Sequence, residues 1–182
     1  MALNASAIES AIKAALPFER NSHYRGDIMA VAVAGGVVDV FTGSAIIIVN
    51  SGGGSSYLIE GVEPAPLESA INGYLTITLS GSHAKGGILS KAVAKGIVAA
   101  ISESMVAVPS MTGGAFPVNG FLSETIISVT QAALESNGIK TTSAYARIMD
   151  MVNAIGIGTA SAVSSNAIFN ADGVGGGVFV ME

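Results

Sequence analysis

The sequence predicts an α+β fold, with a mixed or antiparallel sheet, about four helices and a Gly-rich terminal arm. Three observations support this. Apolar residues recur with helical spacing in several stretches, short β-branched runs lie between them, and many of the 23 glycines cluster where segments end. We expect residues 1–17 to form an N-terminal helix that can act as an interaction arm. Residues 18–182 are then one α+β domain with a flexible Gly-rich C-terminal segment.

The strongest helical pattern covers residues 86–104, where apolar side chains share one face and the helix begins at Gly87. It leads into a short strand over residues 105–108 that ends at Pro109. Three more helices are expected. Residues 4–16 begin with a capping box formed by Ser6 and Glu9, residues 123–136 are capped by Ser123, and residues 144–154 form the fourth.

Several short segments are predicted to be strands. Residues 28–41 are expected to form a β-hairpin that turns at Gly35-Gly36. The β-branched run 45–49 lacks alternation, which indicates a strand buried on both faces. Further strands are expected at residues 57–59, 74–80 and 178–180. Residues 62–72, 110–120 and 155–172 are interpreted as turn-rich or glycine-rich connections.

Charge is scarce along the whole chain. Half of the residues are hydrophobic and 12% are charged, whereas soluble domains average about 25% charged residues. Three runs, residues 40–59, 104–123 and 151–171, contain no charged side chain at all. Since large uncharged surfaces usually mark interfaces, the composition predicts a subunit of a larger assembly.

Composition also argues against several functional classes. The chain has no cysteine, which excludes disulfides, thiolate metal sites and cysteine nucleophiles. Its net charge of −5 argues against binding to a nucleic-acid backbone. The N-terminus does not have the basic and apolar blocks of a signal peptide. None of the uncharged runs is a continuous apolar span, so stable membrane insertion is not expected.

No catalytic, cofactor or metal site is predicted. The glycine-rich loops do not have the spacing of phosphate-binding motifs, and the two histidines have no partner at a ligand spacing. Two alternatives remain open. One is an enzyme that binds phosphate or another small anion near His83, Lys85 and the helix start at Gly87. The other is a membrane-active protein that uses residues 154–163.

Two stretches carry a resemblance to a known class of proteins. MALNASAIESAIKAAL at residues 1–16 and SKAVAKGIVAAISESMVAVPSMTGG within residues 86–114 resemble small virion proteins of tailed bacteriophages. The resemblance implies a non-enzymatic structural protein of the head–tail neck, tail or baseplate, assembled in the host cytoplasm. It also implies that copies pack around a symmetric ring beside other virion proteins. No catalytic residue carries over from it.

The contact residues expected for such a subunit come from three places. They are the apolar stripe of the first helix, the polar loop over residues 18–27, which is the most charged stretch of the chain, and the final strand. The predicted interface residues are Ile8, Ile12, Leu16, Arg20, Arg25, Asp27, Val178 and Val180.

Overall fold

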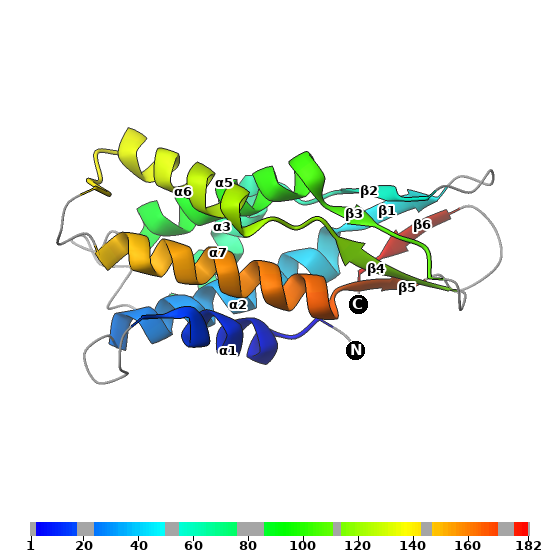
Figure 1. Cartoon of the computed structure of the whole chain (residues 1–182), viewed down its shortest axis with the longest axis horizontal. Coiled ribbons are helices and arrows are strands. Elements are labelled where there is room, and N and C mark those ends of the chain that lie inside the picture. The colour runs from blue at the N-terminus through cyan, green and yellow to red at the C-terminus, as the bar shows by residue number, and fades with distance from the viewer. Residues whose placement is uncertain are drawn as a thin grey trace.

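The computed structural model describes residues 3–17, 24–49, 55–75, 86–110, 114–142, 147–170 and 177–181. Helices lie at one end of an elongated molecule and strands at the other, with the helix axes along the length (Figure 1). The described helices are α1 (Ala5–Ala15), α2 (Tyr24–Ser44), α3 (Pro64–Tyr74), α5 (Gly86–Ser104), α6 (Ser123–Ser136) and α7 (Arg147–Asn166). The described strands are β1 (Ile46–Val49), β2 (Tyr57–Glu60), β3 (Val106–Ala107), β4 (Ala115–Asn119), β5 (Ile168–Asn170) and β6 (Gly177–Val180).

The predicted α+β class is confirmed, and the sheet is antiparallel throughout its described pairs. The helix count is higher than predicted, with six helices in the described ranges. The helices predicted near residues 4–16, 86–104 and 123–136 and the strands predicted at 45–49, 57–59, 105–108 and 178–180 are present with shifts of a few residues. Most of the predicted strand 74–80 lies outside the described residues.

The predicted hairpin at residues 28–41 is wrong, because this stretch belongs to helix α2. Gly35 and Gly36 do not form a turn. They make room for α3, since a Cβ at Gly35 would be 2.7 Å from the Tyr74 ring and one at Gly36 would be 2.7 Å from the backbone nitrogen of Ile71. The β-like run of valines is therefore overridden by close packing between helices.

Three connections were also misassigned. Residues 62–72, predicted as a turn-rich segment, contain α3, whose first residue is Pro64. The backbone N–H at this first position makes no hydrogen bond within a helix, so proline is tolerated there. Residues 110–120 contain β4, in which Pro117 is exposed. Helix α7 runs to Asn166 rather than ending near residue 154, because its glycines pack against neighbouring helices instead of breaking the helix.

The helix caps also differ from the prediction. The side chain of Asn4, not Ser6, caps α1 by accepting a hydrogen bond from the Ala7 backbone N–H at 2.8 Å. Glu9 instead pairs with Lys13 at 2.5 Å. Ser123 is the first residue of α6 and does not cap it, because the N-cap position is held by Leu122. Gly138 ends α6 with a φ of 73°, as its sequence context predicts.

The chain contains a threefold repeat that the sequence analysis did not detect. Each repeat runs from a long helix through two strands to a short helix. The first is α2–β1–β2–α3 and the second is α5–β3–β4–α6. The third begins with α7, β5 and β6, and its short helix is α1 from the other end of the chain, which packs against α7 as α3 packs against α2. The two described ends of the chain accordingly lie close together (Figure 1).

Buried positions of the short helices follow the same repeat. In each one, the residues four and eight positions after the N-cap are completely buried. These pairs are Ile8 and Ile12 in α1, Leu67 and Ile71 in α3, and Ile126 and Thr130 in α6. Because α1 matches the other two helices position by position, it belongs to the body of the fold in this structure.

The sheet order is β5-β4-β3-β2-β1-β6, and an antiparallel bridge between Phe169 and Met181 joins its two outer strands. The sheet is therefore a closed six-stranded ring. Its register repeats with the same threefold relation. Leu58 pairs with Val106, Pro117 with Ile168, and Val180 with Ile46. Closure matters because an open sheet edge offers unpaired backbone groups to other chains.

Strand side chains alternate between the inside and the outside of this ring. The inward positions are buried and fill it, so the narrow ring is a packed core and not a pore. β1 corrects the prediction of burial on both faces, since Ile47 is completely buried while Ile48 is 46% exposed. The buried inward residues are Ile47, Ile59, Ala107, Val118, Phe169 and Met181.

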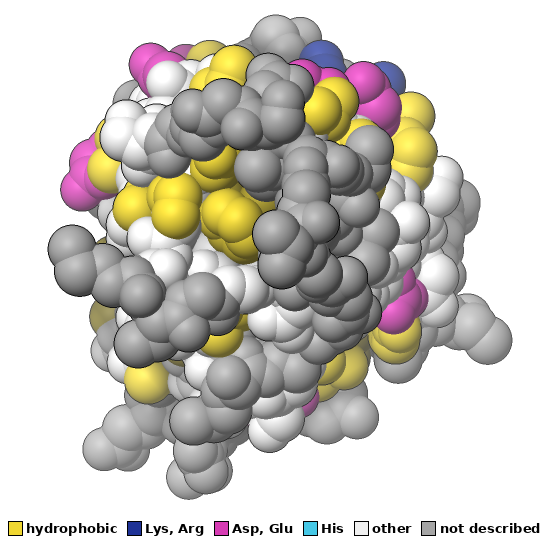
Figure 2. All heavy atoms as spheres, turned by 90° about the vertical axis from the view of Figure 1, so that its right-hand side faces the viewer, with side chains coloured by type: hydrophobic (Ala, Val, Ile, Leu, Met, Phe, Trp, Pro, Cys, Tyr) yellow, Lys and Arg dark blue, Asp and Glu magenta, His cyan; other side chains and the backbone are white. Residues whose placement is uncertain are grey.

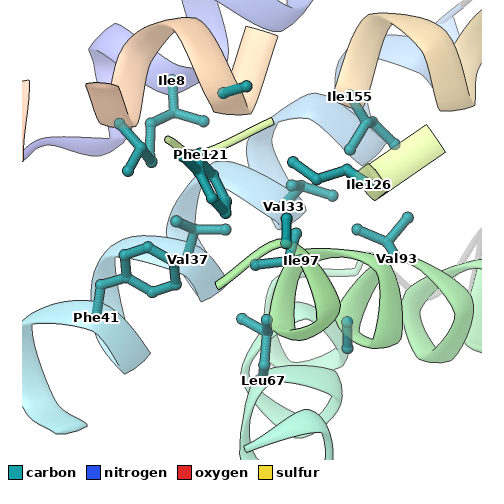
Figure 3. Close-up of a cluster of buried hydrophobic side chains, with 14 of the residues drawn as sticks. Ile8, Val33, Val37, Phe41, Leu67, Val93, Ile97, Phe121, Ile126 and Ile155 are labelled. Carbon is teal, nitrogen blue, oxygen red and sulfur yellow. The ribbon is translucent and has the colours of Figure 1, made fainter. Parts of the chain in front are cut away.

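The helices also form a ring, in which each short helix lies between two long ones. α1 lies between α7 and α2, α3 between α2 and α5, and α6 between α5 and α7. Figure 3 shows the aliphatic core inside this ring, with Val33, Ile97 and Ile155 from the three long helices directed toward the same interior. Ile8, Leu67 and Ile126 from the three short helices contribute to the same cluster.

Candidate interaction surface

The outward side chains of the strands form an apolar band around the strand end of the molecule, here called the strand collar. Alternation places them on the outside because their neighbours in each strand fill the ring. Leu58 is 69% exposed and Ile48 is 46% exposed, which are high values for large aliphatic side chains. The described members of the collar are Ile46, Ile48, Leu58, Val106, Val108, Pro117 and Ile168.

The first outward position of the collar is apolar in every repeat, whereas the next one carries Ile48, Val108 and Asn170. Equivalent positions carry Ile46, Val106 and Ile168 in the three repeats, and all three side chains are half-buried. Outward positions of the long helices vary instead. The three equivalents at one such position, all exposed, are Val31, Lys91 and Asn153. The half-buried first position of the collar is therefore apolar in each repeat, whereas this exposed helix position is not.

Figure 2 looks directly at the strand end. Hydrophobic side chains of the described residues are visible in several patches between residues drawn in grey, Asp and Glu side chains lie around several edges, and the visible Lys and Arg side chains lie at one edge of the view. Glu60 and Asn119 are exposed at the helix-proximal ends of their strands and form a polar border to the collar. Exposed aliphatic side chains with polar residues at their border resemble the apolar core and polar rim of a protein–protein contact.

Aromatic residues lie inside the ring where the strands approach their hairpin connections. Tyr57 and Phe116 occupy equivalent positions in the first two repeats, and their rings meet edge to face with centroids 5.6 Å apart. Phe179 is the equivalent residue in the third repeat, although its side chain lies outside the description. Such pairs stabilise beyond simple burial, and here they close the end of the core behind the collar.

A second apolar surface lies between α6 and α7. It is a shallow hollow of about 480 Å³ in which Leu122 and Ile157 are 45% and 49% exposed. Ala160 and four serines also line it, and Glu124 is the one charged residue among its described lining residues. The equivalent of Ile157 is Gly35 in the first repeat and Lys95 in the second, so this hollow does not repeat around the axis.

The predicted interface residues of the first helix lie inside the fold. Ile8 and Ile12 are completely buried against the rest of this chain, and Leu16 is half-buried against the same core. As folded, the stripe therefore serves internal packing. A contact between this stripe and another subunit requires α1 to leave its place between α2 and α7.

The remaining predicted interface residues are placed only in part. Asp27 is half-buried in the first turn of α2, where its charge complements the helix dipole. Arg20 lies outside the described residues, as does the side chain of Arg25. Val178 and Val180 lie on β6, whose backbone pairs with β1, and their side chains are also outside the description.

Hydrogen bonds shift the pKa of two side chains in the described part of the chain. Tyr74 donates a hydrogen bond to Asp39 at 2.9 Å, and this bond together with the carboxylate charge raises the pKa of Tyr74. At the far end of α6, Glu135 accepts hydrogen bonds from Thr141 and from Gln131, which lower the pKa of Glu135 below its ordinary value of 4.5. Both arrangements tie one element to the residues that pack beside it.

The alternative sites proposed from sequence are located as follows. Within the described ranges no group of three or more His, Asp or Glu side chains is arranged to hold a metal ion. His83 and Lys85, the proposed anion ligands, lie outside these ranges, and Gly87 is exposed in the first turn of α5. The proposed membrane-active segment 154–163 forms the middle of α7, where most residues are buried in the helix ring.

One helix in the described chain is long and apolar enough to span a bilayer. It covers Gly26–Ser44 within α2, and 61% of the most apolar window is buried inside the molecule. Most of its valines and alanines are buried, and α2 contacts α1 and α3, so packing within the ring explains most of its hydrophobicity. This is the behaviour of a core helix that has neighbours on several sides.

Comparison of the chain with protein-family models, with curated proteins and with solved structures found no match.

The collar could not be predicted from any single strand, because the outward face depends on how all the strands pair. A detectable signal was present. Similar segments recur 60 and 62 residues apart, each with two small residues around an aliphatic one and a glycine two positions later. They are Ala32–Val37, Ala92–Ile97 and Ala154–Thr159. Aligning them would have placed Ile46, Val106 and Ile168 at equivalent positions just after each long helix.

Proposed function

We propose that this chain is a structural subunit of a multi-subunit assembly and that copies meet through the strand collar. The observation that carries the proposal is the collar itself, an aliphatic band in which Leu58 is 69% exposed and Ile48 is 46% exposed. Exposed apolar patches on soluble proteins usually mark interaction sites. The low charge of the whole chain supports the same function, because neutral surfaces approach one another without repulsion.

The closed sheet defines how such contacts form. Since the described strands are all paired around the ring, strand addition at a sheet edge is not the mode of association. Contacts instead use side chains, led by Leu58 and Ile48. Interfaces of permanent assemblies are the more hydrophobic kind, which fits a band of Ile, Val and Leu.

The specific form of the proposal is a virion component of a tailed bacteriophage, at the head–tail neck, tail or baseplate. Its support is the resemblance of residues 1–16 and 86–114 to small virion proteins. In the structure these residues are α1 and the helix–strand unit at the start of the second repeat. Mass spectrometry of purified particles from the source culture tests this form. Recovery of the chain only from the soluble cell fraction would contradict it.

Association through the collar is tested by measuring molar mass with size-exclusion chromatography and light scattering over a wide concentration range. We expect the wild-type chain to assemble beyond a dimer and the Ile48→Ser/Leu58→Ser variant to lose this larger assembly. The matched control is Val31→Ser/Ile157→Ser, which replaces two similarly exposed aliphatic side chains at the helix end and is expected to assemble normally. A monomeric wild type at all concentrations, or equal loss in both variants, would refute the role of the collar.

A further inference from the structure

The third repeat is completed by a helix that is not covalently continuous with it. In the first two repeats the short helix directly follows its strand, through Gly61-Val62 before α3 and Gly120-Phe121 before α6. In the third repeat the strand β6 lies at the C-terminal end of the described chain and α1 at the N-terminal end. Within the sequence, α1 is joined to the other described elements through the segment that leads to α2 and not through β6.

The contacts of α1 are of a kind that another copy can supply equally well. Ile8 and Ile12 are completely buried. Gly158 of α7 allows α1 to pack this closely, because a Cβ at Gly158 would collide with the backbone of Ile12. Among the described residues, the hydrogen bonds made by α1 stay within α1 and its caps. Its counterpart α6 differs, since Thr130 donates a hydrogen bond to the Ala92 carbonyl of α5 at 3.4 Å.

The backbone is extended directly after α1. Leu16 has φ −70° and ψ 126°, as expected before Pro17, so the chain leaves the helix in an extended conformation. Residues 16–23 separate α1 from α2, and eight extended residues span up to about 26 Å. The sequence from Glu19 to Asp27 is the most charged part of the chain and is suited to water.

We propose that the slot between α2 and α7 is a helix-exchange site and that the α1 of a second copy of this chain fills it in the assembled state. An isolated 11-residue helix is not stable in water, so an α1 that leaves its slot folds again only by entering another one. Reciprocal exchange gives a closed dimer in which each slot is filled and each core is complete. This inference stands on α1 and its slot and does not depend on the collar.

Complementation between two full-length variants tests the exchange. Both carry Ile48→Ser/Leu58→Ser, so that association through the collar cannot contribute. The donor-defective chain adds Ile8→Asp/Ile12→Asp and keeps an intact slot. The acceptor-defective chain adds Gly158→Leu and keeps an intact α1. We expect each to be monomeric alone and an equimolar mixture to form a 1:1 complex, with a twofold rise in molar mass by light scattering.

The control replaces Gly158→Leu with Gly87→Leu, at an exposed glycine where a side chain meets open space. That chain keeps its own α1 in place, and we expect it to form less heterodimer with the donor-defective chain. If a variant does not fold alone, the two are refolded together. Recovery of helical circular dichroism with a 1:1 mass then supports exchange. A mixture that stays monomeric, or does not refold, overturns it.

Discussion

Gly36 of α2 lies directly against Ile71 of α3, so close that a Cβ on Gly36 would be 2.7 Å from the Ile71 backbone nitrogen. The same relationship recurs at Gly96 with Thr130 and at Gly158 with Ile12. These three glycines occupy equivalent positions in the three long helices. Each sets the distance at which a short helix packs on its long helix, and together they fix the diameter of the helix ring.

The first prediction follows from this contact. Gly36→Ala should destabilise the fold by about 1–3 kcal/mol, because the added methyl group forces α2 and α3 apart. Gly43→Ala, in the last turn of the same helix, meets open space and should be neutral or stabilising by up to about 1 kcal/mol from helix propensity. Urea denaturation measures both changes. Equal effects at the two positions would show that the close approach at Gly36 is unimportant.

The second prediction concerns Thr159, whose hydroxyl is buried without a hydrogen-bond partner among the described atoms. Its equivalents are Val37 and Ile97, so an apolar side chain fits this position in the other repeats. Thr159→Val should raise the free energy of unfolding by about 1 kcal/mol, because an unsatisfied buried hydroxyl costs about 1–3 kcal/mol.

Thr130→Val is the matched control for this change. Thr130 is just as buried, but its hydroxyl donates to the Ala92 carbonyl, so its replacement removes a hydrogen bond and should not stabilise. Thermal unfolding of both variants distinguishes the cases. A Thr159→Val variant that unfolds at a lower temperature than the wild type would indicate that the hydroxyl does find a partner in solution.

The third prediction is a pH dependence at the end of α6. The folded pKa of Glu135 lies below its ordinary 4.5 because the carboxylate accepts hydrogen bonds from Thr141 and Gln131. This stabilisation is complete above the unfolded pKa and is lost as the pH falls through the lower folded pKa. The stability difference between wild type and Glu135→Gln should therefore shrink below about pH 4.5.

Carboxyl NMR provides the direct measurement. The Glu135 titration midpoint should lie below 4.5 in the wild-type chain and move back toward 4.5 in Thr141→Val, which removes the larger cause of the shift. An unchanged midpoint in that variant would mean that the hydrogen bond from Thr141 does not hold in solution.

The spacing of apolar residues correctly predicted the helices that bury only one face. Apolar side chains repeat regularly in α1 and α6, while their outer faces are polar, as in Glu9 and Glu124, so their spacing identified them. α2 did not follow this rule because it contacts α1, α3 and α7 and is apolar almost all round. Its Val, Ala and Gly residues then resemble a hairpin, and only the requirement for close approach at Gly35 and Gly36 explains a helix.

The candidate surface was harder to predict because exposure depends on the closed ring. Ile46 to Val49 has the composition of a strand buried on both faces, yet Ile48 faces outward. Conversely, Ile8 and Ile12 have the spacing of a docking stripe and are internal. Which apolar face is free is decided by contacts between segments more than 100 residues apart, such as α1 with α7, and no local pattern encodes them.

The last prediction concerns the third repeat, whose short helix α1 lies at the start of the sequence while α7, β5 and β6 lie at its end. In the first repeat two residues separate buried Ile59 of β2 from buried Val62 before α3, and the equivalent pair in the third repeat is Met181 and Leu3. Fusing Glu182 to Met1 leaves three residues between them, so no added linker is required. A circular permutant made in this way, with new ends opened between residues 21 and 22, contains three contiguous repeats and should fold to the same structure.

We expect the permutant to match the wild type in far-UV circular dichroism and in the cooperativity of urea unfolding, with stability within about 2 kcal/mol because only loop-closure entropy changes. A control permutant opened between Gly96 and Ile97 interrupts α5 at its contact with α6 and should not fold cooperatively. If the first permutant also unfolded without a cooperative transition, α1 would not be the short helix of the third repeat. If both folded equally well, the position of the ends would carry no information about the repeat.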